Sequence, residues 1–219
     1  MIYCTHNLNV SQIIFNYSKL LVPSDFIIIK LDASPTLSIK SLSQNEDITA
    51  LKSFSEQLGV TIIIYSMVMI KKSSLLTSII IENGQFISTS SQIFAGNSPY
   101  NSINFCNSDK GLIGIVLGND ILYTDLWRIY KVARPKFLFF LNSSNTTPTL
   151  LTMSKALSIA CNTKIISIFN DQTFSINSNG TIGDIQSGNL RLFSGHRTTP
   201  KPFIGKKNIT VKVLPVEID

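Results

Sequence analysis

Charged residues and metal-binding side chains are scarce in this chain. Only 15% of its 219 residues are charged, and it has two histidines and three cysteines. His6 and His196 lie far apart, and Cys4, Cys106 and Cys161 show no ligand spacing. Because metal sites need clustered ligands, we expect no metal site. The sequence also has no glycine-rich phosphate loop, so we expect no cofactor.

The sequence also shows no pattern that predicts disulfides, a secretion signal or a membrane span. An odd number of cysteines without a close pair gives no disulfide framework and fits a reducing compartment. Polar residues interrupt the stretch from residue 1 to residue 20, unlike the apolar centre of a signal peptide. The most apolar run, residues 61–70, is half of the about 20 residues that a spanning helix needs. We therefore expect a soluble cytoplasmic protein without a membrane partner.

Apolar residues, in contrast, make up 44% of the chain and follow the periodicities of strands and helices. Asn83-Gly84 and Asn179-Gly180 each lie between two strand-like runs and predict hairpins. Helical spacing predicts helices at residues 11–21, with Ser11 as the N-cap, at 47–58, from about 120 onward, and at 150–161. Short β-branched runs predict strands at 2–8, 26–31, 60–69, 75–81, 85–89, 103–106, 112–117, 137–141, 163–169, 173–176, 181–185 and 209–218.

This order of strands, helices and hairpins is typical of an α/β protein with mixed sheets. The strands outnumber those of one ordinary sheet, so two sheets packed together with helices outside would accommodate them. No composition break divides the chain, and we expect a single domain over residues 1–219.

The most informative segment is residues 111–128, GLIGIVLGNDILYTDLWR. It predicts a buried strand over 112–117, a sharp turn at Gly118, Asn119 and Asp120, and then a helix. Many α/β hydrolytic enzymes present a nucleophile on such a strand, turn and helix. The nucleophile's place holds Gly118, which has no side chain. The segment therefore indicates an enzyme's frame without its reactive group.

The order of elements and the local motifs resemble the nitrilase, or carbon–nitrogen hydrolase, family over nearly the whole chain. Family members read Gly, three apolar residues, Cys-x-Asp, then x-x-Phe-Pro-Glu and, three residues later, Arg. The same spacing holds here at Gly114, Gly118, Asp120, Tyr123, Thr124, Asp125 and Arg128. The resemblance implies a four-layer α-β-β-α sandwich with two mixed sheets. It also implies a homodimer or larger assembly paired through the helix near Asp120. Trp127 and Tyr130 would suit this contact, although core packing explains them equally well.

The resemblance also indicates where the family's catalytic Glu, Lys and Cys would lie. Leu31 stands in the place of the Glu, with Asp32 one residue later; Gln92 stands in the place of the Lys; Gly118 replaces the Cys. A thiolate attack assisted by a carboxylate and a lysine needs all three groups. We therefore predict a catalytically inactive pseudoenzyme that binds a small molecule or acts as a regulator or subunit.

The sequence also allows two alternative functions. Asp32 could act as a residual carboxylate in a divergent amide or nitrile hydrolase. The segment 191–207, which holds five Lys or Arg residues and no acid, could be an interaction module. We expect no nucleic-acid partner, because its aromatic residues show no stacking pattern. Cys106 as a relocated nucleophile is disfavoured, since a cysteine in a strand is usually a small buried hydrophobe.

The retained motif residues have a structural interpretation. Asn119 and Asp120 lie in the turn, and Asp120 is placed to cap the helix that follows. Asp125 and Arg128 lie three residues apart on that helix, a spacing at which they can form an ion pair. These roles would preserve the fold after catalysis was lost.

Overall fold

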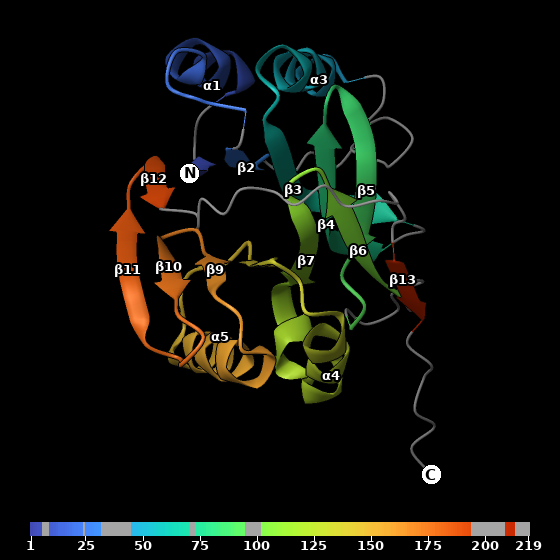
Figure 1. Ribbon diagram of the computed structural model, residues 1–219, viewed down its shortest axis with the longest axis vertical. Helices are drawn as coiled ribbons and strands as arrows, with labels where there is room; N and C mark the ends of the chain where they lie inside the picture. The colour runs from blue at the N-terminus through green and yellow to red at the C-terminus, as the bar shows by residue number, and fades with distance from the viewer. Residues whose placement is uncertain are drawn as a thin grey trace.

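The chain folds into two packed sheets with helices on both outer faces, as Figure 1 shows. The computed structural model describes residues 1–5, 9–23, 25–31, 45–70, 73–94, 102–193 and 209–212. Helices α1 (Val10–Tyr17) and α3 (Glu46–Leu58) cover one sheet. Helices α4 (Thr124–Ala133) and α5 (Pro148–Cys161) cover the other. The predicted four-layer α-β-β-α sandwich with two mixed sheets is confirmed.

The first sheet has the strand order β12-β1-β2-β3-β4-β5. Its strands β1, β2 and β3 run parallel, whereas β4, β5 and β12 join it by antiparallel pairing. Their bounds are Ile2–Thr5 (β1), Phe26–Lys30 (β2), Thr61–Ile70 (β3), Ser73–Glu82 (β4), Gln85–Ser91 (β5) and Leu190–Phe193 (β12).

The second sheet has the order β11-β10-β9-β8-β7-β6-β13. Strands β7, β8 and β9 run parallel in its centre, and antiparallel strands flank them. The bounds are Ser102–Ser108 (β6), Gly111–Leu117 (β7), Phe137–Leu141 (β8), Ile165–Ile168 (β9), Gln172–Ile176 (β10), Ile182–Ser187 (β11) and Ile209–Lys212 (β13). Both Asn-Gly hairpins predicted from the sequence lie in these sheets, between β4 and β5 and between β10 and β11.

Three apolar layers hold the sandwich together. The central layer joins inward-facing residues of both sheets, such as Ile63 of β3 and Phe139 of β8. One outer layer packs the first sheet against α1 and α3, and the other packs the second sheet against α4 and α5. Burial on both faces explains why the central strands read as nearly continuous apolar runs instead of alternating ones.

Helix α1 begins earlier than its sequence pattern suggested. Asn9, not Ser11, is its N-cap, because the Asn9 side chain accepts a hydrogen bond from the Gln12 backbone at 2.8 Å. The Gln12 side chain in turn accepts one from the Asn9 backbone at 3.2 Å. This reciprocal pair is a capping box, which a lone serine at position 11 could not form. Helix α3 ends as predicted at Gly59, whose φ of +63° suits glycine.

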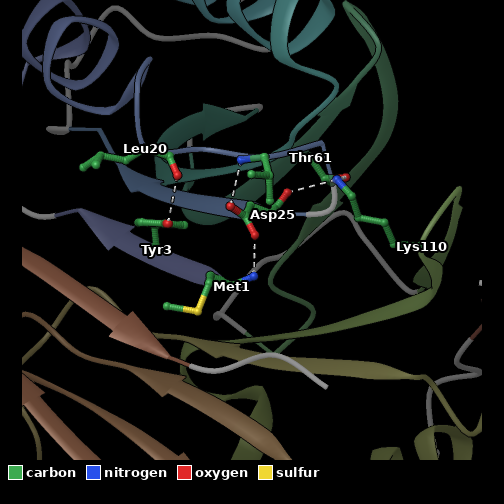
Figure 2. Close-up of polar contacts among 7 residues, drawn as sticks. Met1, Tyr3, Leu20, Asp25, Thr61 and Lys110 are labelled. Carbon is green, nitrogen blue, oxygen red and sulfur yellow. Dashed lines mark hydrogen bonds and ion pairs between the residues drawn. The ribbon is translucent and has the colours of Figure 1, made fainter. Parts of the chain in front are cut away.

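A polar cluster ties the two sheets together at the edge where β2 begins (Figure 2). The Asp25 carboxylate pairs with the Met1 amine and accepts a hydrogen bond from the Val22 backbone at 3.0 Å. Lys110, on the turn between β6 and β7, donates to Asp25 O at 2.9 Å and to Thr61 Oγ1 at 2.6 Å. Burial lowers the pKa of Lys110 to about 8. This cluster lies at the opposite edge from the carboxyl ends of the parallel strands.

Candidate functional site

The predicted turn after β7 forms at Gly118. This residue opens the short 3₁₀ helix η1 (Gly118–Leu122) and has a φ of +51°. That left-handed conformation is easy for glycine and strained for other residues. Strand-to-helix turns that expose a nucleophile are strained in the same way. The backbone frame of a nucleophile turn is therefore present with no reactive atom on it.

The Gln92 side chain lies directly over Gly118. A β-carbon at position 118 would lie 3.1 Å from Gln92 Nε2 and 3.3 Å from Gln92 Oε1. Gln92 follows β5, is buried, and its backbone N–H donates to Leu76 O of β4 at 2.9 Å. Two of the three positions assigned to the catalytic triad thus meet across the two sheets. Neither carries an ionisable or nucleophilic group.

Further contacts join the carboxyl ends of the strands along the same edge. Ser143, just after β8, donates to Met67 Sδ of β3 at 3.9 Å. Lys30, the last residue of β2, donates to Asn170 Oδ1 just after β9 at 2.6 Å. Asn170 Nδ2 donates to Ser143 O at 2.6 Å. In this way β2 faces the end of β9, β3 faces the end of β8, and the end of β5 faces the end of β7 across the two sheets.

This architecture is shared with solved structures of low sequence identity. A CN-hydrolase superfamily protein from Xanthomonas campestris matches with a TM-score of 0.65 and 10% identity over 97% of this chain and 89% of that one. A nitrilase-superfamily member from Saccharomyces cerevisiae matches with a TM-score of 0.63 and 10% identity over 98% of this chain and 90% of that one. The fold is that of the carbon–nitrogen hydrolases.

A carbon–nitrogen hydrolase from Helicobacter pylori matches with a TM-score of 0.61 and 12% identity over 85% of this chain and 84% of that one. No protein-family model and no curated protein matches the sequence. The nitrilase fold is therefore shown by three-dimensional architecture alone.

Leu31, the third triad position, does not meet the other two. Its backbone N–H donates to Tyr65 O at 3.0 Å, and its side chain packs into the apolar layer under α1 and α3. Asp32 lies outside the described residues. Strand alternation instead puts Lys30 on the face between the sheets, in line with Phe26 and Ile28. Sequence reasoning missed Lys30 because it compared single positions and did not follow this alternation.

The prediction that Asp120 caps a helix is wrong. Its Oδ2 accepts from the Ile93 backbone N–H at 2.9 Å, and its Oδ1 accepts from the Phe94 backbone N–H at 2.8 Å. The N-cap of α4 is Tyr123, which makes no side-chain capping bond. Burial raises the pKa of the Asp120 carboxyl to about 6, although the two N–H groups favour its charged form. Asp120 therefore fastens the segment that carries Gln92.

The other motif residues on this segment lie at the surface. Asn119, Asp125 and Arg128 are exposed. Asp125 and Arg128 form no ion pair with each other in the part of the chain that the structure describes, so the predicted pair is wrong. Both residues are exposed, and an ion pair at the surface contributes little free energy.

Trp127 and Tyr130, for which the sequence allows a dimer contact or core packing equally well, belong to the apolar layer beneath α4. Tyr130 is buried and donates to Ile115 O at 2.7 Å. Trp127 is half-buried and its Nε1 donates to Ile121 O at 3.1 Å. Both rings therefore stabilise the protomer itself.

Cys106 lies in the central apolar layer between the sheets. Burial raises the pKa of its thiol to about 12. A neutral thiol is a poor nucleophile and a poor metal ligand.

Among the described residues, no group of three or more His, Cys, Asp or Glu side chains could hold a metal ion. No helix in the described ranges is long and apolar enough to cross a membrane.

Arg191, the first residue of the predicted basic segment, is not a surface residue. It lies on β12 and is 2% exposed. Its guanidinium donates five hydrogen bonds, to Gly188 O, Phe169 O, Thr173 Oγ1, Asn170 O and Asp171 O, at 2.8–3.0 Å. Arg191 therefore joins the two sheets and leaves no donor for an external partner. Residues 194–207 of the segment lie outside the described residues.

Proposed function

We propose that this chain uses the nitrilase fold to bind a small molecule without hydrolysing it, as a binding or regulatory protein. The observation that carries the proposal is the contact between Gln92 and Gly118. A carboxamide over a glycine can donate and accept hydrogen bonds. It cannot form the covalent intermediate that carbon–nitrogen hydrolysis through a cysteine requires.

The surroundings of Gly118 support the same proposal. The Cys106 thiol lies in the apolar layer and its raised pKa keeps it neutral. Leu31 packs on the opposite face of its sheet. Losing a nucleophile removes most of an enzyme's rate even when the remaining groups stay in place. A divergent hydrolase that uses Asp32 is the competing function, and it predicts turnover that Asp32→Asn abolishes.

The homodimer expected from the family resemblance is part of this proposal. Val132 on α4 and Ile159 on α5 support it, since they are 83% and 57% exposed on the outer face of the sandwich. A contact between the outer helices of two copies would remove such apolar side chains from water.

A thermal-shift screen of short amides, nitriles and their acids tests the proposal. We expect at least one compound to raise the melting temperature of the full chain. A ligand at one hundred times its Kd stabilises the folded state by about 2.7 kcal/mol, which corresponds to several degrees. Mass spectrometry should recover this compound unchanged. Recovery as its hydrolysis product, or no shift with any compound, would contradict the proposal.

A further inference from the structure

Lys30 is a cation between two sheets without an acidic partner in the described residues. Its side chain is half-buried. Within the described residues, Lys30 Nζ makes one hydrogen bond, which it donates to Asn170 Oδ1. An ammonium carries three N–H donors, so further donors remain for a ligand. The one ion pair among the described residues, between Met1 and Asp25, lies at the other edge of the sheet. Among the described residues, therefore, no acidic side chain forms an ion pair with Lys30.

Two buried hydroxyl groups continue the row that Lys30 begins. In the register of the first sheet, Lys30 lies beside Tyr65 of β3, and Tyr65 lies beside Ser78 of β4. All three side chains face the space between the sheets, because their strand neighbours at alternate positions belong to the central layer. Tyr65 Oη and Ser78 Oγ are buried and have no hydrogen-bond partner among the described residues. Buried polar atoms without partners are rare in folded proteins and need an explanation, and a bound acceptor group is one.

A second cation adds to the positive charge around Lys30. The guanidinium of Arg191 donates to Asn170 O, and Lys30 donates to the side chain of the same residue. The neighbouring carboxylate, Asp171, is exposed and accepts two hydrogen bonds from Thr146 at 2.8 Å. Its negative charge offsets part of the charge of Arg191. Two positive charges thus meet at residue 170 with one carboxylate nearby, which favours an anion.

We propose that Lys30, Tyr65 and Ser78 bind the carboxylate of a small organic acid between the carboxyl ends of the strands. A carboxylate offers about four acceptor positions, which matches one ammonium and two hydroxyl donors. This subsite rests on the proposed small-molecule function and gives it a ligand class. The acid lies beside Asn170, on the β2–β9 side of the edge that carries Gln92 and Gly118.

Isothermal titration of the full chain with propionate and with propionamide tests the subsite. The two probes have nearly the same shape, but only propionate carries a charge. We expect propionate to bind at least tenfold more tightly than propionamide. Lys30→Met should weaken propionate roughly tenfold or more, because a hydrogen bond to a charged group is lost. Lys19→Met, at an exposed position after α1, is the matched control and should leave both affinities unchanged.

Tyr65→Phe separates a binding role from a packing role. Removing an unpartnered buried hydroxyl should leave the melting temperature of the free protein unchanged or raised. It should weaken propionate roughly threefold to tenfold, and Ser78→Ala should act in the same direction. If the ligand-free Tyr65→Phe protein had a lower melting temperature than the unmodified chain, the hydroxyl would already have a partner in the fold. This result would overturn the subsite.

The two proposals fail in different ways. Binding of propionamide or a nitrile, but not of propionate, would overturn the carboxylate subsite and leave the small-molecule function standing. Equal affinity of Lys30→Met and the unmodified chain for propionate would do the same. If none of these compounds binds, both proposals are overturned.

Discussion

Replacing Arg191 with methionine is expected to lower the free energy of unfolding by about 3–5 kcal/mol, because buried acceptors then lose their donor. Four of the five hydrogen bonds of the guanidinium go to carbonyl groups on the turns beside β9, β10 and β11, and the fifth goes to Thr173 Oγ1 on β10, whereas Arg191 itself lies on β12 of the other sheet. Arg191→Lys should also be destabilising, since an ammonium has three donors instead of a planar fork of five. Urea unfolding followed by the fluorescence of Trp127, the single tryptophan, measures both effects.

Arg128→Met is the matched control for this substitution. Arg128 is exposed on α4 and should change the free energy of unfolding by less than about 0.5 kcal/mol. Burying the Arg191 guanidinium costs solvation free energy. Arg191→Met therefore regains part of the stability that it loses with the hydrogen bonds. If Arg191→Met proved as stable as the unmodified chain, the carbonyl groups would have other donors, and Arg191 would not join the sheets as described.

Replacing Asp120 with alanine is expected to cost about 2–4 kcal/mol of unfolding free energy. The substitution leaves the backbone N–H groups of Ile93 and Phe94 without their acceptor, and charged hydrogen bonds contribute more than neutral ones. A helix cap would contribute only about 1 kcal/mol. Chemical denaturation at pH 7 therefore distinguishes the two roles. A loss of 1 kcal/mol or less would show that Asp120 does not hold the segment that carries Gln92.

The pH dependence of stability gives an independent test of the same carboxylate. Burial raises the pKa of Asp120 to about 6, above the value of about 3.9 in an unfolded chain. The folded chain then binds more protons between pH 4 and 6, so the stability that protonation of this carboxyl adds is fully present below pH 4 and is lost as the pH rises through 6. The hydrogen bonds from Ile93 and Phe94 contribute separately at pH 7. The difference amounts to about 3 kcal/mol.

Asp120→Asn cannot titrate and serves as the reference for this measurement. The unfolding free energy of the unmodified chain, relative to Asp120→Asn, should fall as the pH rises from 4 to 7. A difference that stays flat, or that rises over this range, would show that the carboxyl group is solvated or that its hydrogen bonds outweigh its burial.

Local patterns predicted much of the fold. Most of the strands, though not β12, are visible as short apolar runs, because burial on both faces favours apolar side chains along the strand. Asn-Gly pairs marked both hairpins, and Gly59 marked the end of α3, because each needs a left-handed backbone. The strand and turn that end at Gly118 followed from the same local signals.

The side-chain partners of the site could not be predicted in this way. Asp120 was assigned to the helix beside it, but its partners lie on the segment after β5, 26 and 27 residues away in sequence. Arg191 was grouped with neighbouring basic residues, although its acceptors come from turns of the other sheet. Such long-range contacts depend on how the two sheets pack, which no local spacing records. Lys30 is the exception, since strand alternation would have put it on the inner face.

Ammonia release from amides and nitriles is the most direct measurement of whether this nitrilase fold still performs hydrolysis. The full chain would be incubated with a panel of short amides and nitriles, with an active amidase as the positive control. We expect no ammonia above the buffer rate from the unmodified chain, and the same result from Asp32→Asn and Cys106→Ser. Sustained release by the unmodified chain that disappears in either variant would show that this fold has kept its chemistry, and would contradict a binding function without catalysis.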